Sequence, residues 1–396
     1  WITTSEAAQR LGVKRATLYA YVSRGLIRSV RRPGQQESLF ARAEVDALAS
    51  TTRPSGGAQP LLRFRGVATA VTSHAGGELS YRGVALAQLV SDARFATAAA
   101  LVLGCSPADL EGPRLGPPSL GPVLRALPIE RRLPVAMQLL AAGNPLAVDV
   151  RPATVRRTAA LSVLEAVLAL DEGSSVAAEG ASSPTADRRA DLDDLPVLVL
   201  RALRGGPTPR ADTDIVRVLL ISLLDHGLTA STVAARVAAS TRAGVHDCLC
   251  AAYAAMAGPL HGAAPIAARA LLDDPAPASD AVAAALRRHG DVPGFGHFLY
   301  PSGDPRAEIV LDAVWRRRGT GRLRRRFEAL ADVVESHSGA RPNIDLASAV
   351  ALSALRLPAE AGEVVFQVAR SFGVVAHVLE EYAETPLRWR GQESSG

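Results

Sequence analysis

Aromatic residues are scarce in this sequence. Phe, Tyr and Trp make up only 4% of the 396 residues, whereas hydrophobic residues of all kinds make up 48%. A large core can therefore be buried, which excludes wholesale disorder, but alanine, leucine and valine must build it. Such a composition favours helices over a β-sandwich. We expect a mainly α-helical protein of two or three domains.

Cysteine and long apolar runs are scarce too. The three cysteines, Cys105, Cys248 and Cys250, fit neither a disulfide framework nor the ligand spacing of a zinc site. No uninterrupted apolar run approaches 18 residues, and the first residues are polar and amphipathic, unlike a signal peptide. These absences predict a soluble, cytoplasmic protein with reduced thiols, no metal site and no contact with a membrane.

Lysine occurs once, at Lys14, and every other basic side chain is arginine. The formal net charge is +5, and residues 1–55 carry nine Lys/Arg against four Asp/Glu. The rest of the chain therefore holds 35 basic and 35 acidic residues. The whole positive excess lies in the first seventh of the sequence, and the body that follows is neutral.

Two low-complexity stretches divide the chain. Residues 51–61 form a Pro/Gly/Ser-rich linker without apolar periodicity, which separates a domain at 1–50 from the rest. Residues 171–191, rich in Ser, Ala, Asp and Glu, interrupt a helical pattern and are interpreted as a surface insertion. From about residue 85 onward the apolar spacing is mostly helical, which predicts a mainly α body.

The basic N-terminal segment has the pattern of a winged helix-turn-helix domain. The capping box Thr3-Thr-Ser-Glu6 predicts a helix that ends at Gly12-Val13, and a second, basic helix begins near Lys14. A wing follows, turning at Pro33-Gly34. The segment resembles the heads of MerR-type and excisionase-type proteins, which implies contact with double-stranded DNA; the alternative is a helical appendage with solvated arginines. The candidate DNA contacts are Lys14, Arg15, Thr17, Tyr21 and Arg31.

Three histidines and one aspartate of the body have unusual settings. His261 and His297 stand beside glycines, which let the backbone approach a ligand closely. His226 follows an apolar helical run that ends at Leu224, and Asp345 stands at a predicted helix start, where capping explains it equally well. Singly each has an ordinary structural explanation, but together they form a candidate active site.

The other histidines that we considered have ordinary explanations. His246, His289 and His337 are expected on the surface, and His377 in the core or an interface because it lies in an apolar helical stretch.

The order and spacing of six motifs over most of residues 62–396 resemble the citrate synthase family. The first histidine motif surrounds His226, the second His261 and the third His297, and an aspartate motif and an arginine motif follow. The motifs are Ser80–Gly83, Leu224–Thr232, Gly258–Gly262, Pro293–His297 with Asp304-Pro-Arg306, Arg341–Asp345 and Ala369–Gly373.

The resemblance implies a nearly all-helical homodimer. Its large domain would comprise residues 62–257 and 353–396, and a small domain, residues 258–352, would close over it. The implied reaction, a step of the tricarboxylic acid cycle, is the Claisen condensation of acetyl-CoA with oxaloacetate, followed by thioester hydrolysis. A thioester methyl group is a weak carbon acid, so a base needs help from a donor to the enolate oxygen. Asp345 would be this base and His261 this donor, while His297 would polarise and protonate the oxaloacetate carbonyl.

Further roles follow from the same resemblance. Arg306 and Arg370 would neutralise substrate carboxylates, and His226 would add a contact. Arg388, or with nearly equal claim Arg390, would reach the partner subunit's site. Exposed backbone at Pro293, Gly294, Phe295 and Gly296 would receive the CoA adenine. Neither a cofactor nor a metal is needed.

The sequence also departs from the family. Thr229 and Pro265 stand where asparagine is common, Ala263 where glycine is common, and Phe298 where arginine is common. These changes leave every proposed catalytic group in place but affect CoA contacts or acyl preference. The alternatives are therefore a 2-methylcitrate synthase that uses propionyl-CoA, and a transcriptional regulator whose body senses oxaloacetate or CoA esters without turnover.

Overall fold

The structure is a computed structural model that describes residues 2–11, 13, 18–19, 21–22, 27–31, 38–42, 44–45, 67–113, 120–174 and 191–389. The chain divides into two compact units. One comprises residues 1–65 with 283–292, and the other comprises residues 66–282 with 293–396. The predicted linker at 51–61 and most of the predicted insertion at 171–191 lie outside the described residues.

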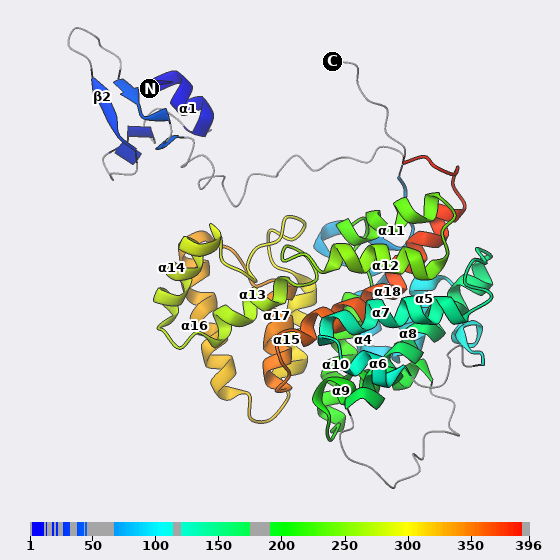
Figure 1. The fold of residues 1–396 in the computed structure, drawn as a ribbon. Coiled ribbons are helices and arrows are strands. Elements are labelled where there is room, and N and C mark those ends of the chain that lie inside the picture. Colours follow the sequence, from blue (N-terminus) through cyan, green and yellow to red (C-terminus); the bar gives the residue numbers. More distant parts are fainter. Residues whose placement is uncertain are drawn as a thin grey trace. The chain divides into compact units, whose positions relative to one another are not determined.

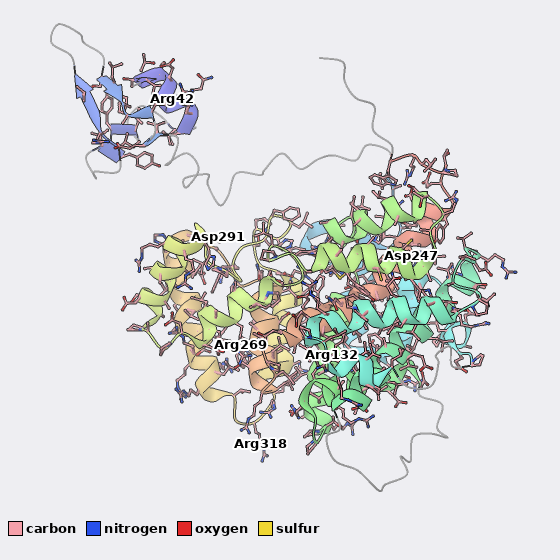
Figure 2. The ribbon with its side chains drawn as sticks, in the orientation of Figure 1. Arg42, Arg132, Asp247, Arg269, Asp291 and Arg318 are labelled. Carbon is pink, nitrogen blue, oxygen red and sulfur yellow. The ribbon has the colours of Figure 1, made fainter. Side chains whose placement is uncertain are left out.

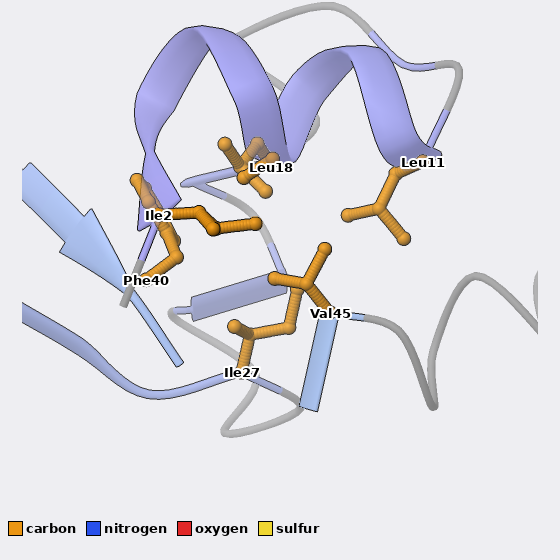
Figure 3. Packing of buried hydrophobic residues seen from close by; sticks show 7 residues of the cluster. Ile2, Leu11, Leu18, Ile27, Phe40 and Val45 are labelled. Atoms are coloured by element: carbon orange, nitrogen blue, oxygen red, sulfur yellow. The ribbon is translucent and has the colours of Figure 1, made fainter. Parts of the chain in front are cut away.

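The N-terminal head combines a helix with a small antiparallel sheet. Strands β1 (Ile2–Thr3), β2 (Ser29–Arg31) and β3 (Ser38–Phe40) pair in the order β1-β3-β2, and α1 spans Thr4–Leu11. The predicted capping box is present, because Glu6 accepts the backbone N–H of Thr3 at 2.8 Å while Thr3 Oγ1 accepts the N–H of Glu6 at 3.3 Å. The buried side chains, shown in Figure 3, are Ile2, Ala7, Leu11, Leu18, Ile27, Phe40 and Val45.

The candidate DNA contacts are only partly described. Lys14, Arg15 and Thr17 lie outside the described residues, and Arg31 is placed in β2 by its backbone alone. Tyr21 is helical, is half-buried and packs against the core of the head, and its contact with DNA stays a prediction.

The rest of the chain is built mainly of helices, as the alanine- and leucine-rich composition predicts (Figure 1). Short strands β4 (Thr72–Ser73), β5 (Ser80–Tyr81) and β6 (Val84–Ala85) form an antiparallel sheet before them. The helices are α4 (Leu86–Asp92), α5 (Phe95–Leu103), α6 (Gly121–Arg125), α7 (Ile129–Gly143), α8 (Pro152–Ser174), α9 (Leu195–Arg204), α10 (Arg210–Leu223), α11 (Ala230–Ser240), α12 (Val245–Met256), α13 (Ala264–Asp273), α14 (Ala278–His289), α15 (Pro305–Trp315), α16 (Gly321–Ser338), α17 (Ile344–Ala354) and α18 (Ala361–Tyr382).

Helix α18 is the central helix of the body. It packs against α5, α7, α8, α10, α11 and α12, and nearly all of its side chains are buried. Its length and hydropathy match those of a membrane-spanning helix, but 94% of its most apolar window is buried inside the protein. A helix that is apolar on all sides is expected in such a central position. Charged side chains such as Asp247 and Arg318 lie at the surface instead (Figure 2).

A second group of helices packs around α17. Helix α17 packs against α13, α15 and α16, and α15 also packs against α10. His289 and His337 are exposed as expected, and His377 is buried in the core as expected. His246, expected on the surface, is only 1% exposed, because α12 turns it toward Ser162 of α8.

Candidate active site

The first histidine motif forms the connection between α10 and α11. Helix α10 ends at Leu223, and His226 follows in a turn where it is 7% exposed. Its Nε2 lies 3.0 Å from the hydroxyl of Tyr300, and its ring stands nearly perpendicular to the ring of His297, with centroids 5.1 Å apart. Burial and the nearby Arg306 and Arg370 cations hold the pKa of His226 well below its usual value, so its imidazole is neutral.

His297 lies at the end of a tight loop that carries Gly294. The φ of Gly294 is +86°, and a Cβ there would lie 2.7 Å from Cβ of Leu346, so glycine is required on both grounds. The backbone N–H of Leu299 donates to Nδ1 of His297 at 3.1 Å. Burial, reinforced by Arg306, lowers the pKa of His297 to about 4. Its ring is therefore neutral, with its proton on Nε2.

Asp304 organises the start of two helices. Its carboxylate caps α15 by accepting the N–H of Arg306 at 3.0 Å, and it accepts the N–H of Ile344 in α17 at 3.0 Å. The same carboxylate pairs with the Arg306 guanidinium through Nε at 2.9 Å and Nη2 at 2.7 Å. Both side chains are at most 3% exposed, so this two-point pair fixes a buried cation in one orientation.

Asp345 lies in the first turn of α17, but it does not cap the helix. Asn343 is the cap, because its side chain accepts the N–H groups of Asp345 and Leu346 at 2.9 and 3.4 Å. The carboxylate of Asp345 accepts no hydrogen bond from the described part of the chain. Burial raises the pKa of Asp345 to about 6, although the Arg306 cation opposes the shift. A carboxylate with such a pKa is suited to accept a proton near neutral pH.

His261 lies in the turn between α12 and α13. Gly262 follows it closely against α12, where a Cβ would lie 2.6 Å from the carbonyl oxygen of Met256. Nε2 of His261 is 2.7 Å from Oγ of Ser231, and the ring meets Phe366 edge to face at 5.3 Å. Burial lowers the pKa of His261 to about 4, so this imidazole is neutral as well.

Arg370 of α18 supplies a second buried cation. Its Nε donates to the carbonyl oxygen of Leu223 at 3.0 Å, its Nη1 to Oγ1 of Thr229 at 3.5 Å, and its guanidinium lies over the ring of Phe366 at 4.7 Å. Burial lowers the pKa of Arg370 to about 10, which leaves it charged at neutral pH. The lowered pKa values of His226 and His261 both include a contribution from this cation.

A hydrogen-bonded series of hydroxyls connects Arg370 to His261. Thr229 Oγ1 lies 3.2 Å from Oγ of Ser231, which in turn contacts Nε2 of His261. A guanidinium only donates, so Thr229 accepts from Arg370 and can donate its own hydrogen bond to Ser231. Ser231 can then donate to Nε2 of His261. That direction leaves the proton of His261 on Nδ1. Thr229, a departure from the family pattern, is thus an integral member of the site.

Sequence reasoning missed four side chains that complete this cluster. His74 and Tyr300 are hydrogen-bonded to each other at 2.9 Å and lie beside His226. Asp225, the sequence neighbour of His226, forms a fully buried pair with His377 at 3.1 Å. Asp225 lies inside a recognised motif and Tyr300 between the two parts of another, but His74 stands in Thr72-Ser-His-Ala, outside every recognised motif.

Part of the backbone of the predicted CoA segment is hydrogen-bonded within the protein. Gly294 O accepts the N–H of Asn343 at 2.9 Å, Gly296 donates to Arg341 O at 2.8 Å, and Gly296 O accepts the side-chain amide of Asn343 at 2.9 Å. Gly294 is also buried. Gly294 is therefore not exposed, and these bonds hold the His297 loop against the start of α17; the predicted contact of Pro293–Gly296 with CoA stays a prediction.

Arg388 pairs with a carboxylate near the end of α18. It donates to Glu381 through Nε at 2.8 Å and Nη2 at 2.7 Å, within its own chain. Arg390 lies outside the described residues. The predicted reach of either arginine into the partner subunit's site stays a prediction.

No group of three or more His, Cys, Asp or Glu side chains in the described ranges has the arrangement of a metal site. The three cysteines are all free.

Known proteins match both parts of the chain. The family model "Citrate synthase, C-terminal domain" matches residues 63–390, and a helix-turn-helix domain model matches residues 1–53. A Mycobacterium tuberculosis protein named "Putative citrate synthase 2" is 32% identical over 77% of this chain and 83% of its own length. A protein named 2-methylcitrate synthase from Shewanella oneidensis is 30% identical over 77% of this chain and 85% of its own.

Solved structures agree on the fold. Citrate synthase from Pyrobaculum aerophilum superposes with a TM-score of 0.67 at 22% identity, over 93% of this chain and 95% of that one. Citrate synthase from Thermotoga maritima gives 0.66 at 22% identity, over 87% and 95%. The match to the family model over most of the sequence is decisive: the chain belongs to the citrate synthase family, as a citrate synthase-type enzyme that carries a helix-turn-helix domain at residues 1–53.

Proposed function

We propose that this protein condenses acetyl-CoA with oxaloacetate to citrate and free CoA. The observation that carries the proposal is the half-buried carboxylate of Asp345, whose pKa burial raises to about 6 against the opposing charge of Arg306. A carbon acid as weak as a thioester methyl group needs such a base beside donors to the developing negative charge.

In this mechanism Asp345 takes a proton from the methyl carbon of acetyl-CoA. The Nδ1–H of His261, oriented through Ser231 and Thr229, donates to the thioester oxygen as it gains enolate character. The new carbon–carbon bond forms on the oxaloacetate carbonyl carbon, while Nε2–H of His297 gives its proton to the carbonyl oxygen. Water then adds to the thioester carbonyl carbon and returns a proton to Nε2 of His297. The carbon–sulfur bond breaks as the proton held by Asp345 passes to the sulfur, and CoA leaves as the thiol. Charge is stabilised by hydrogen bonds at each step, so no free enolate or alkoxide accumulates.

The two arginines suit the carboxylates of oxaloacetate. Asp304 holds Nε and Nη2 of Arg306, and Nη1 has no partner among the described residues. Arg370 likewise uses Nε and Nη1 within the fold, and the described chain offers its Nη2 no partner. Each guanidinium is thus fixed by the protein while keeping donors for an anion. His226 adds one further contact.

We also propose that the chain works as a homodimer in the cytoplasm, where its free thiols stay reduced. In each subunit, residues 258–352 would close over residues 62–257 and 353–396 once oxaloacetate is bound. Closure would prevent wasteful hydrolysis of acetyl-CoA before its partner arrives. Arg388 or Arg390 would contact the site of the partner.

A 2-methylcitrate synthase is the second candidate, favoured by the Shewanella oneidensis relative of that name. The two reactions use the same residues and differ in one methylene of the acyl group, which a pocket distinguishes by only about 10–200-fold. A thiol-release assay with oxaloacetate and either acetyl-CoA or propionyl-CoA separates them through the ratio of their kcat/KM values.

The same assay tests whether the body is an enzyme rather than a sensor. We expect Asp345→Ala to lower the condensation rate by roughly 10²–10⁴, the range for a positioned acid or base. Asp332→Ala, which removes an exposed carboxylate from α16, is the matched control and should keep the wild-type rate. Oxaloacetate binding without thiol release from either acyl-CoA would support the sensor, and an unchanged rate in Asp345→Ala would refute the assigned base.

For the head we propose binding to double-stranded DNA, because the positive excess of the chain and the helix-turn-helix match coincide at residues 1–55. Two heads of a dimer would address half-sites about 34 Å apart or a multiple of it. Affinity for duplex DNA should fall steeply as salt rises. Arg15→Ala should weaken it, whereas Arg318→Ala, an exposed arginine of the body, should not. Undetectable affinity at low salt, or affinity that salt does not change, contradicts the proposal.

A further inference from the structure

The hydroxyl of Tyr300 lies between two imidazoles. It is 2.9 Å from Nδ1 of His74 and 3.0 Å from Nε2 of His226. The two imidazole rings meet edge to face, with centroids 4.7 Å apart. Tyr300 is 4% exposed and His226 is 7% exposed, so water competes little for these bonds. His74 directly follows β4, His226 lies in the α10–α11 turn and Tyr300 in the loop before α15, and only the fold brings these side chains together.

All three groups are neutral. Burial lowers the pKa of both imidazoles, and Arg306 adds to the effect on each. Burial also raises the pKa of Tyr300 to about 12, so its hydroxyl keeps its proton. A neutral imidazole has one N–H and one bare nitrogen, and a phenol has one proton to donate. The two bonds therefore have only two complete arrangements.

In one arrangement Tyr300 donates to His226 and His74 donates to Tyr300; in the other both directions are reversed. The first leaves Nδ1 of His226 protonated, and the second leaves it bare. Nδ1 has no hydrogen-bond partner among the described residues, so it is the nitrogen that remains for a ligand. The carboxylates and the ketone of oxaloacetate only accept hydrogen bonds. Only the first arrangement therefore makes His226 a donor to the substrate.

We propose that His74 is a positioning residue for oxaloacetate: by donating its Nδ1–H to Tyr300, it fixes the tautomer in which His226 presents Nδ1–H to the substrate. This inference rests on the proposed function of the site. His74 acts through Tyr300 and does not itself touch the substrate.

The test is a set of variants in the full-length protein, measured by calorimetric titration with oxaloacetate and by steady-state kinetics. His74→Phe removes the donor and retains a ring, and it should weaken oxaloacetate binding about tenfold, the effect of one lost hydrogen bond. The KM for oxaloacetate should rise accordingly, with a smaller change in kcat. His74→Asn places an amide N–H near the position of Nδ1 and should restore binding to within about threefold of wild type. His337→Phe, an exposed histidine of α16, is the control for the substitution itself.

A second comparison separates positioning from a general loss of structure. Because His74 acts through the Tyr300 hydroxyl, His74→Phe should add nothing further in a Tyr300→Phe background. Nitrogen-15 chemical shifts of the His226 imidazole should show a protonated Nδ1 in wild type and His74→Asn, and a mixture of tautomers in His74→Phe. Additive losses in the double variant, failure of asparagine to rescue, or an unchanged His226 tautomer would each overturn the proposal.

Binding and turnover are read separately. Tight oxaloacetate binding without thiol release would refute the proposed reaction, but the calorimetric titrations of the variants would still test the role of His74 in binding. A wild-type enzyme with full activity and a His74→Phe variant of unchanged oxaloacetate affinity would remove the role of His74 alone.

Discussion

Replacing His377 by glutamine should destabilise the body of the protein in a pH-dependent way. His377 is fully buried, with Nε2 at 3.1 Å from Oδ2 of Asp225 and Nδ1 at 3.3 Å from Oε2 of Glu380. Arg236 also pairs with Glu380 at 2.9 Å, so Glu380 keeps a cation in the variant. Among the described residues, Asp225 would keep the hydroxyl of Thr72, the N–H of Gly227 and the more distant charge of Arg370.

The size of the effect follows from the electrostatics of the pair. Burial disfavours a charged imidazole, but Asp225 and Glu380 outweigh it and raise the pKa of His377 from 6.5 to about 9. At 1.36 kcal/mol per pKa unit this difference corresponds to about 3 kcal/mol of stability. Breaking a buried ion pair by removing one partner costs about 3–5 kcal/mol, which agrees.

The sign of the pH dependence is fixed by the raised pKa. The contribution of His377 is fully present below its unfolded pKa of about 6.5 and is lost as the pH rises through about 9. Wild type and His377→Gln should therefore differ in free energy of unfolding by about 3 kcal/mol at pH 6 and by under about 1 kcal/mol at pH 9.5.

Urea unfolding followed by far-ultraviolet circular dichroism measures this difference. His337→Gln, which changes an exposed histidine of α16, is the matched control and should follow the wild type at both pH values. A difference between wild type and His377→Gln that is the same at pH 6 and pH 9.5 would show that the imidazole is not the buried cation that we infer.

Three further predictions concern the site. The kcat/KM for acetyl-CoA should fall below about pH 6 in a steady-state pH profile, because burial raises the pKa of Asp345 to about 6 and the base acts only when ionised. His261→Ala should lower kcat by about 10²–10³, as for one oxyanion donor, without weakening oxaloacetate binding in a calorimetric titration. Gly294→Ala should destabilise the protein by at least about 2 kcal/mol and so lower its thermal midpoint, because the new Cβ would meet Leu346 at a φ of +86°. Gly206→Ala, where a Cβ has open space, should leave the midpoint unchanged.

The sequence predicts the polar groups of the site better than their surroundings. Glycine context marks His261 and His297, and both turn out to be half-buried, neutral imidazoles in tight loops. Capping explained Asp345 equally well from the sequence, but only the structure shows that Asn343 caps the helix. A helix start is visible in a sequence, whereas the choice between two adjacent polar side chains depends on backbone geometry.

Contacts between distant segments were not predictable. His74 and Tyr300 are 226 positions apart, and nothing in either local pattern indicates a hydrogen bond between them. His246 fails for a related reason: its neighbours allow an exposed or a buried face, and the packing of α12 on α8 decides for burial. Apolar periodicity identifies a helix but not which of two similar faces meets the core.

The two buried arginines explain why the histidines of this site depend on their neighbours. Arg306 and Arg370 provide positive charge, and the same charge, added to burial, keeps His226, His261 and His297 neutral. A neutral imidazole donates from one nitrogen only, so its usefulness depends on which nitrogen holds the proton.

Each of the three rings has one nitrogen bonded to a protein group. The partners are Tyr300 Oη for His226, Ser231 Oγ for His261 and Leu299 N–H for His297. The last partner can only donate, so it fixes the tautomer of His297 without help, whereas a hydroxyl can face either way. The hydroxyl of Ser231 can take its direction from Thr229, which Arg370 contacts, although Thr229 also lies 3.2 Å from Oγ1 of Thr232; among the described residues the hydroxyl of Tyr300 has His74 as its second partner. The tautomers of His226 and His261 should therefore change when a residue that contacts the partner hydroxyl is substituted, whereas the tautomer of His297 should not.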